Sequence, residues 1–180
     1  MSRVRIVGGQ WRSRLIDVPE ATGLRPTPDR VRETLFNWLG QDLTGLRCLD
    51  LFAGSGALGF EAASRGAAEV VLVENLPRIY THLQKTAAML GAQNLRLVRG
   101  DAIKFLQSTT ERFDVIFLDP PYRQGWLTKI EPWLDKLLTP HGRVYAESEE
   151  VIEKLGALRC IRAGRAGQVH YQLFCFEDEQ

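Results

Sequence analysis

The sequence has few cysteines and histidines and no long apolar segment. Cys48, Cys160 and Cys175 are odd in number, widely spaced and set among apolar neighbours, which predicts reduced core thiols and not disulfides. Neither they nor the three histidines have a metal-ligand spacing, so we expect no metal. No apolar run approaches the roughly 18 residues that cross a bilayer, and the N-terminus lacks the apolar core of a signal peptide. We therefore expect a cytoplasmic protein with no membrane partner.

The chain as a whole has little net charge, +1, because its basic and acidic residues nearly balance. The basic residues, however, are concentrated at the N-terminal end. Residues 1–32 hold seven arginines against three acids, a local charge of +4, while the remainder carries −3. A basic segment on a near-neutral body is typical of a protein that binds a polyanion such as nucleic acid. A solvated surface with no partner would have the same composition.

From residue 47 onward, short apolar runs alternate with helical patterns. The runs at 47–52, 70–74, 95–100, 113–120 and 143–148 predict strands, and the segments near 57–66, 77–90, 102–108 and 127–138 predict helices. Strands and helices that alternate at this spacing form right-handed βαβ units, so we expect an α/β fold with a mostly parallel sheet covered on both faces. Continuously apolar strands are typical of such a buried sheet.

The two ends of the chain differ from this pattern. Residues 157–177 have two β-rich runs around a glycine-containing turn, which predicts an antiparallel hairpin and brings the sheet to seven strands. Residues 3–18 predict a second, small hairpin with Gly8 and Gly9 at its bend. Residues 25–40 predict a helix with Thr27 as N-cap, Pro28 at the first helical position and Asp29 in the first turn. We therefore divide the chain into a basic extension, 1–40, and a body, 41–180.

The stretch LDLFAGSGALG, residues 49–59, follows a predicted strand and opens a helix. Gly54, Gly56 and Gly59 match G-x-G-x-x-G, and Glu74 ends the next strand 20 residues after Gly54, where its carboxylate can accept both hydroxyl hydrogens of a ribose. The pattern alone predicts a bound nucleoside without naming it. Asp50 and Asp119 add negative charge nearby, which repels a pyrophosphate and favours a sulfonium and an ammonium group. S-adenosylmethionine therefore fits better than NAD.

Asp101 directly follows the third strand and lies at the same edge of the predicted sheet. Its carboxylate can accept the amino group of an adenine, with the backbone of Ala102 near a ring nitrogen. It can also cap the helix at 102–108, and the two roles are compatible.

The stretch FLDPPY, residues 117–122, ends the fourth strand with two prolines. Proline fixes its own φ and holds the preceding residue extended, so the Asp119 carboxylate and the Pro120 carbonyl become rigid neighbouring acceptors. A flat base with an exocyclic amino group can donate one hydrogen to each, while Tyr122 stacks on its face. This grip favours a pyramidal nitrogen whose lone pair points at a methyl donor. Asp119 or solvent takes the released proton.

These motifs resemble a known family. FAGSGALG with DPPY is similar to S-adenosylmethionine-dependent N-methyltransferases of planar amines, and RIVGGQWRSR, RPTPDRVRETLFNWL and AGQVHY resemble the RsmD family of 16S rRNA guanine-N2 methyltransferases. The resemblance covers nearly the whole chain. It implies a Rossmann-like class I methyltransferase fold and transfer of a methyl group to guanine 966 of 16S rRNA, in the 30S subunit or its assembly intermediate. The product would be S-adenosylhomocysteine, and we expect a monomer.

The resemblance also assigns residues by position. Catalysis falls to Asp119, Pro120, Pro121 and Tyr122. The cofactor contacts fall to Thr27, Asp50, Phe52, Ala53, Gly54, Ser55, Gly56, Glu74, Asn75, Leu76, Asp101, Ala102 and Asp119. The expected RNA contacts are Arg3, Arg5, Arg12, Arg14, Arg25, Arg30, Arg32, Tyr122 and Arg123. The segment Arg25-Pro26-Thr27 is expected to close over the cofactor, whereas Glu74-Asn75-Leu76 departs from the E-x-D that relatives often show.

Two other functions remain open on the sequence. A DNA or RNA adenine-N6 methyltransferase uses the same catalytic motif, although such enzymes usually need a target-recognition domain for which 180 residues leave no room. A non-catalytic RNA-binding assembly protein on the same fold is the other alternative. The intact FLDPPY and glycine loop argue against it.

Overall fold

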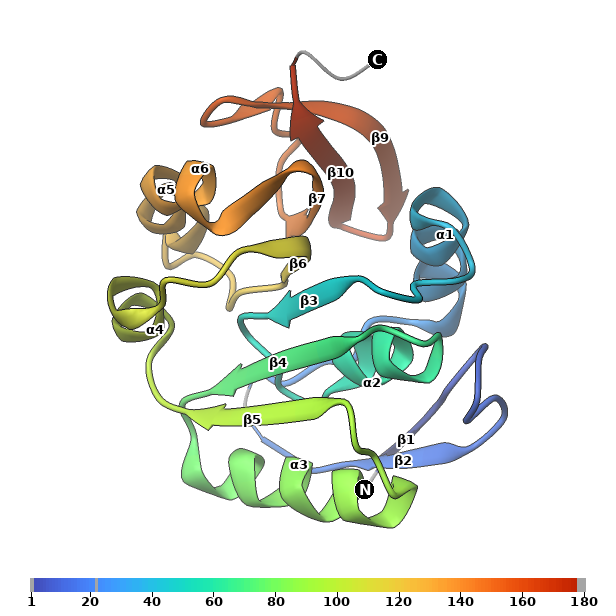
Figure 1. Cartoon of the computed structure of the whole chain (residues 1–180). Helices are drawn as coiled ribbons and strands as arrows, with labels where there is room; N and C mark the ends of the chain where they lie inside the picture. Colours follow the sequence, from blue (N-terminus) through green and yellow to red (C-terminus); the bar gives the residue numbers. More distant parts are fainter. Residues whose placement is uncertain (1, 22, 178–180) are drawn as a thin grey trace.

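The computed structural model describes residues 2–21 and 23–177 and has a twisted sheet with helices on both faces (Figure 1). The strand order of the main sheet is β5-β4-β3-β6-β7-β10-β9-β8. Its parallel part comprises β3 (Arg47–Asp50), β4 (Glu69–Glu74), β5 (Leu95–Arg99), β6 (Phe113–Leu118) and β7 (Leu138–Ser148). Its antiparallel part comprises β8 (Lys154–Leu155), β9 (Leu158–Ala166) and β10 (Val169–Phe176). The predicted mixed sheet with a C-terminal hairpin is confirmed, and the two-residue β8 makes eight strands in place of seven.

The connecting helices are α2 (Ala57–Ser64), α3 (Pro77–Leu90) and α4 (Ala102–Ser108), followed by α5 (Trp126–Ile130), η1 (Glu131–Trp133) and α6 (Leu134–Leu137). The prediction of one helix over 127–138 is wrong, because Pro132 lacks the N–H that a continuous helix needs and the chain forms a 3₁₀ turn there. No helix in the described ranges is long and apolar enough to cross a membrane.

Strand β7 begins five residues before the predicted run at 143–148. Leu138 pairs with Phe113, and the register then shifts before Arg143 pairs with Val115. Pro140 and Gly142 within this stretch are typical of turns, so the sequence pattern did not predict a strand there.

The two faces of the sheet bury alternate residues of each strand. Along β6, Val115 and Phe117 belong to the core beneath α1, α2 and α3, whereas Ile116 and Leu118 belong to the core beneath α4, α5 and α6. Successive side chains of a strand point to opposite faces, so continuous apolar runs fill two cores at once. The sheet is therefore packed between two apolar cores.

The N-terminal segment forms β1 (Ser2–Arg5) and β2 (Leu15–Val18), a two-stranded antiparallel sheet beside α3, and then α1 (Asp29–Leu39) (Figure 1). The hairpin is confirmed, but residues 6–14 form a long loop that lies on α2 instead of a tight bend. Gly9, with φ +81°, approaches α2 so closely that a Cβ atom would lie 2.0 Å from the Ser64 carbonyl oxygen. The close contact with α2, more than the turn, explains why residue 9 is a glycine.

The predicted N-cap of α1 is wrong. The capping position is Pro28, and the Thr27 hydroxyl donates instead to Glu147 Oε1 at 2.9 Å. Asp29 does lie in the first turn. Thr27 is thus used to join the N-terminal segment to the far strand β7.

Candidate active site

A cavity of about 860 Å³ opens where the parallel strands end. It lies between the loop after β3, the ends of β4 and β6, and the segment that precedes α1. Asp119, Pro120, Pro121 and Tyr122 all line it. In an open α/β sheet this edge is where ligands bind, because the polar ends of several strands and helices meet there.

The glycine loop forms the floor of the cavity beside β4. Gly54 has φ +53° and Gly56 has φ +83°, which is backbone geometry that side chains disfavour. A Cβ atom on Gly59 would lie 2.8 Å from Leu72, so this glycine lets α2 pack closely on β4. The Gly54 N–H donates to Glu74 Oε2 at 2.8 Å, which ties the loop to the predicted ribose acceptor.

Of the thirteen residues assigned to the cofactor, all except Gly56 line the cavity. Gly56 is not among the lining residues, and an added Cβ would lie 2.3 Å from the Phe60 ring, so this glycine lets the loop pack against α2. Its direct contact with the cofactor stays a prediction. Asp101 lines the cavity and also caps α4, since its carboxylate accepts the Lys104 N–H at 3.1 Å.

The Asp50 carboxyl is buried in the cavity wall. Its Oδ2 accepts the Gly59 N–H at 3.1 Å, whereas its Oδ1 has no hydrogen-bond partner within residues 2–21 and 23–177. Burial raises the Asp50 pKa to about 7, although the Gly59 hydrogen bond opposes the shift; the charges of Glu74 and Glu147 add to it. An unpaired buried carboxylate oxygen is costly, so this atom is suited to a cationic hydrogen-bond donor.

The raised Asp50 pKa predicts that affinity for S-adenosylmethionine increases with pH. Below about pH 7 the free protein holds Asp50 neutral, and above it the carboxylate attracts the cation. Between pH 6 and pH 8 the association constant, measured by calorimetry, is expected to rise about tenfold. Asp50→Asn keeps an oxygen for the Gly59 N–H and should flatten the rise. An unchanged pH profile in this variant would contradict the assignment.

Asp119 follows β6 and has a second carboxyl beside it. Glu147 lies on the neighbouring strand β7, lines the cavity and is 7% exposed. Burial raises the Asp119 pKa well above its ordinary value, and the neighbouring Glu147 carboxyl raises it further, while the nearby Thr27 hydroxyl opposes the shift. Two neighbouring carboxyls at this edge of the sheet give the site a negative potential that favours a cation.

Tyr122 stands at the mouth of the cavity, with 41% of its surface exposed. Burial of its hydroxyl end, together with the charges of Glu147 and Asp119, raises its pKa to about 12. The phenol is therefore neutral at physiological pH. A neutral, accessible ring at this place is suited to stacking on a flat base.

The arginines assigned to RNA divide into two groups. Arg32 is wrong as an RNA contact, because its side chain is fully buried and bonds to Glu61, Asp29 and the carbonyls of Thr27 and Arg5. The others are exposed: Arg3, Arg5, Arg12, Arg14, Arg25, Arg30 and Arg123. Of these exposed arginines, only Arg25 lines the cavity.

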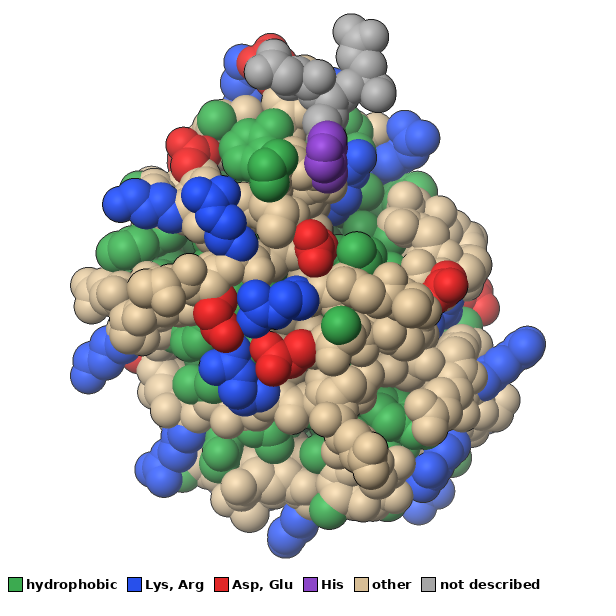
Figure 2. Space-filling view, in the orientation of Figure 1, with side chains coloured by type: hydrophobic (Ala, Val, Ile, Leu, Met, Phe, Trp, Pro, Cys, Tyr) green, Lys and Arg blue, Asp and Glu red, His purple; other side chains and the backbone are tan. Residues whose placement is uncertain are grey.

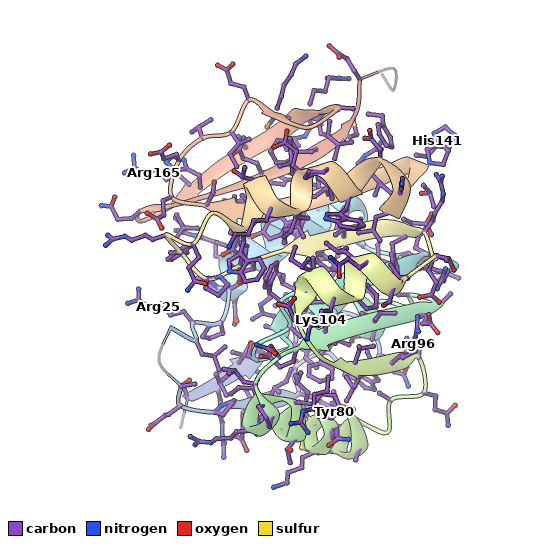
Figure 3. The ribbon with its side chains drawn as sticks, turned by 90° about the vertical axis from the view of Figure 1, so that its left-hand side faces the viewer. Arg25, Tyr80, Arg96, Lys104, His141 and Arg165 are labelled. Carbon is purple, nitrogen blue, oxygen red and sulfur yellow. The ribbon has the colours of Figure 1, made fainter. Side chains whose placement is uncertain are left out.

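Arg25 and Arg165 project from the same side of the molecule, away from Arg96 and His141 (Figure 3). Arg165 lies at the end of β9, next to Ala166, which lines the cavity. In the view of Figure 2, by contrast, basic side chains lie both around the outline and near the centre, where acidic side chains stand beside them. Positive charge beside the mouth thus comes from both ends of the chain, and Arg165 was not assigned from the sequence.

Glu147 and Tyr171 are among the cavity residues that sequence reasoning did not assign. Glu147 is the last but one residue of β7, and Tyr171 lies on β10 with its ring stacked on Trp38 at a centroid distance of 5.4 Å. Glu147 belongs to no motif, and Tyr171 ends AGQVHY, a stretch to which no site role was assigned; the order of strands brings both residues to the cavity. In the part of the chain that the structure describes, no group of three or more His, Cys, Asp and Glu side chains is arranged to hold a metal ion.

The fold and the cavity together define a class I S-adenosylmethionine-dependent methyltransferase. A profile of the family described as Conserved hypothetical protein 95 matches residues 4–175. The chain belongs to this family, which is the RsmD family that the motifs resemble.

Individual relatives agree with this assignment. The chain is 43% identical to "Ribosomal RNA small subunit methyltransferase D" of Escherichia coli K12, over 96% of this chain and 89% of that protein. A solved structure of a putative methyltransferase from Escherichia coli has a TM-score of 0.88 at 43% identity and covers 99% of this chain and 100% of that one. A Salinibacter ruber RNA methyltransferase in complex with S-adenosyl-L-homocysteine, at 21% identity and a TM-score of 0.68, covers 87% and 97% and shares the fold.

Proposed function

We propose that this protein transfers a methyl group from S-adenosylmethionine to the exocyclic N2 of a guanine in small-subunit ribosomal RNA, guanine 966 of 16S rRNA. One observation carries the chemistry: the Asp119 and Pro120 acceptors, the stacking ring of Tyr122 and the glycine loop line a single cavity. The near full-length identity to a small-subunit rRNA methyltransferase supports the class of substrate.

The residues of the cavity fit the cofactor. S-adenosylmethionine supplies an electrophilic methyl group on a sulfonium. The unpaired Oδ1 of Asp50 is suited to its ammonium group, and Asp101 with Ala102 borders the space for its adenine. Glu74 accepts N–H groups from Gly54 and Leu76, and its carboxylate retains lone pairs for two ribose hydroxyls.

The protein acts on the amine by holding it. Asp119 and the Pro120 carbonyl each accept one hydrogen of the amino group, which turns the nitrogen lone pair toward the methyl carbon. A nitrogen–carbon bond forms as the carbon–sulfur bond breaks, and the amine, which is cationic after transfer, then loses a proton. The protein would lower the activation barrier by positioning the amino group and by placing the Asp119 carboxylate beside the positive charge that develops on it.

The RNA partner is expected to lie over the mouth of the cavity. We assign residues 1–40 to RNA binding and residues 41–180 to the methyltransferase body, with Arg12 and Arg14 in the exposed loop region and Arg25 at the cavity. Lysine and arginine contacts to phosphates make affinity fall with salt. The protein would act as a monomer in the cytoplasm, on the 30S subunit or its assembly intermediate.

A methyl-acceptor assay tests this function. Purified protein with labelled S-adenosylmethionine is given 30S particles lacking the modification, naked 16S rRNA, and DNA. We expect labelled N2-methylguanine in the particles, less in naked rRNA and none in DNA. Label in adenine, label in DNA, or no transfer to any substrate would reject the proposal.

Replacement of Tyr122 tests base stacking. Loss of a base–aromatic stack costs roughly 1–3 kcal/mol, so Tyr122→Ala should lower kcat/KM for the RNA substrate about 10- to 100-fold. Tyr122→Phe keeps the ring and should stay within about threefold of wild type on the same ground. Equal losses in both variants would assign the effect to the hydroxyl and contradict the stacking role.

A further inference from the structure

Glu147 lies beside Asp119 because of the register of two parallel strands. Leu118 of β6 pairs with Ala146 of β7, so the residues that follow them, Asp119 and Glu147, are neighbours at the carboxyl edge of the sheet. Both line the cavity, and the charge of Glu147 is close enough to raise the pKa of Asp119. The site therefore has a third fixed acceptor group next to the two that hold the amino group.

Two hydroxyl groups fix the orientation of the Glu147 carboxyl. Thr27 Oγ1 donates to Oε1 at 2.9 Å, and the buried Tyr145 hydroxyl donates to the same oxygen at 2.6 Å. Burial and the Glu147 charge raise the pKa of Tyr145 well above its usual range, so this phenol remains a donor. A buried carboxyl whose orientation is fixed by two hydrogen bonds can discriminate between substrates, because a substrate without the matching donor leaves it unpaired.

The bases that bear an exocyclic amino group differ at the ring atom next to it. Guanine has an N1–H donor beside its amino-bearing carbon, whereas adenine and cytosine have a ring nitrogen with a lone pair. A carboxylate facing N1–H gains a charge-assisted hydrogen bond. The same carboxylate facing a lone pair is repelled, and both groups stay buried without a partner.

We propose that Glu147 selects guanine by accepting its N1–H while Asp119 and the Pro120 carbonyl hold its N2 amino group. This inference rests on the proposed function and adds the residue that determines the base. Glu147 is a specificity residue that contacts the ring, and Thr27 and Tyr145 are positioning residues that act through it.

The test changes the target base at N1 and at the neighbouring position 6. Small-subunit particles are assembled with guanine, 6-thioguanine or 2-aminopurine at the methylated position. 6-Thioguanine keeps N1–H and the amino group and changes only the O6 atom, whereas 2-aminopurine keeps the amino group and has a lone pair at N1. For wild-type protein we expect kcat/KM for guanine and 6-thioguanine to agree within about fivefold, and that for 2-aminopurine to be about 10- to 100-fold lower, as for one well-formed base contact.

The Glu147→Gln variant tests the residue itself. Its amide can donate to the N1 of 2-aminopurine, so the preference for guanine should fall to about fivefold or less, through loss on guanine and relative gain on 2-aminopurine. Glu150→Gln removes an exposed carboxyl three residues away that does not line the cavity, and it should keep the wild-type preference. The melting temperature and the affinity for S-adenosylhomocysteine report whether each variant is folded.

The outcomes separate this inference from the function on which it rests. Wild-type protein that methylates 2-aminopurine as well as guanine overturns the inference, and so does a Glu147→Gln variant that is slower on both bases by the same factor. The latter result would mean that Glu147 only holds Thr27 in place through their hydrogen bond and does not contact the base. The wild-type comparison needs no variant, so it can overturn the inference even if Glu147→Gln fails to fold. Absence of transfer to particles with guanine would instead reject the proposed function.

Discussion

Asp119→Ala is expected to abolish methyl transfer while cofactor binding is largely kept. The change removes one of the two acceptors that orient the amino group, at a place where the rigid Pro120-Pro121 segment offers no replacement. Loss of one preorganised polar group at a reacting centre typically lowers kcat by about 10²–10³-fold. Single-turnover transfer to 30S particles measures the effect directly.

Asp119→Asn is the matched variant for this experiment. It retains an oxygen acceptor but loses the negative charge, so its kcat should lie between those of wild type and Asp119→Ala. Affinity for S-adenosylhomocysteine, measured by calorimetry, should change less than about tenfold in both variants, because Asp50 and Glu74 still line the cavity. Normal transfer by Asp119→Ala would mean that the amine is held elsewhere.

Glu61→Ala is expected to cause the largest loss of stability. Glu61 on α2 is fully buried and accepts the backbone N–H groups of Val7 at 2.8 Å and Gly8 at 3.5 Å. It also pairs with Arg32 at 3.4 Å and with Arg65 at 3.8 Å. Its removal takes the shared carboxylate from two buried cations, which keep only their other partners, and leaves two backbone donors without their acceptor, which costs about 3–5 kcal/mol of the free energy of unfolding. Urea denaturation measures it.

Glu69→Ala is the control for this prediction. Glu69 pairs with Arg47 at 3.1 Å and with Arg96 at 3.4 Å, but its side chain is 38% exposed. Exposed ion pairs contribute about 0–1 kcal/mol, so this variant should remain close to wild type. Equal losses in the two variants would show that burial of Glu61 is not what matters.

The fold could be predicted largely because its strands are local, apolar and buried on both faces. The run at 70–74 corresponds closely to β4, and Asp101 caps α4 as expected. Errors occurred where local residues conflict with long-range pairing. Strand β7 contains Pro140 and Gly142 but is held by its neighbours, while Pro132 interrupts an otherwise helical pattern.

The site could be predicted where its residues are consecutive in the sequence. The backbone geometry of the glycine loop and of FLDPPY is set by their own glycines and prolines, and residues of both motifs line the cavity. Glu147 carries no such signal, since its position depends on the pairing of β6 with β7. Arg32 was misassigned for the same reason: the charge on α1 is visible in the sequence, but its burial against Glu61, 29 residues later, is not.

In the proposed mechanism, Asp119 and the Pro120 carbonyl hold a flat amine beside an activated methyl group. A crystal structure of the protein with S-adenosylmethionine and an RNA fragment that contains the target guanine would show this arrangement directly. We expect the guanine N2 atom to lie within hydrogen-bond distance of both acceptors and about 3–3.5 Å from the methyl carbon. A methyl group that faces away from Pro120 and Pro121, or an N2 atom bound elsewhere, would contradict it.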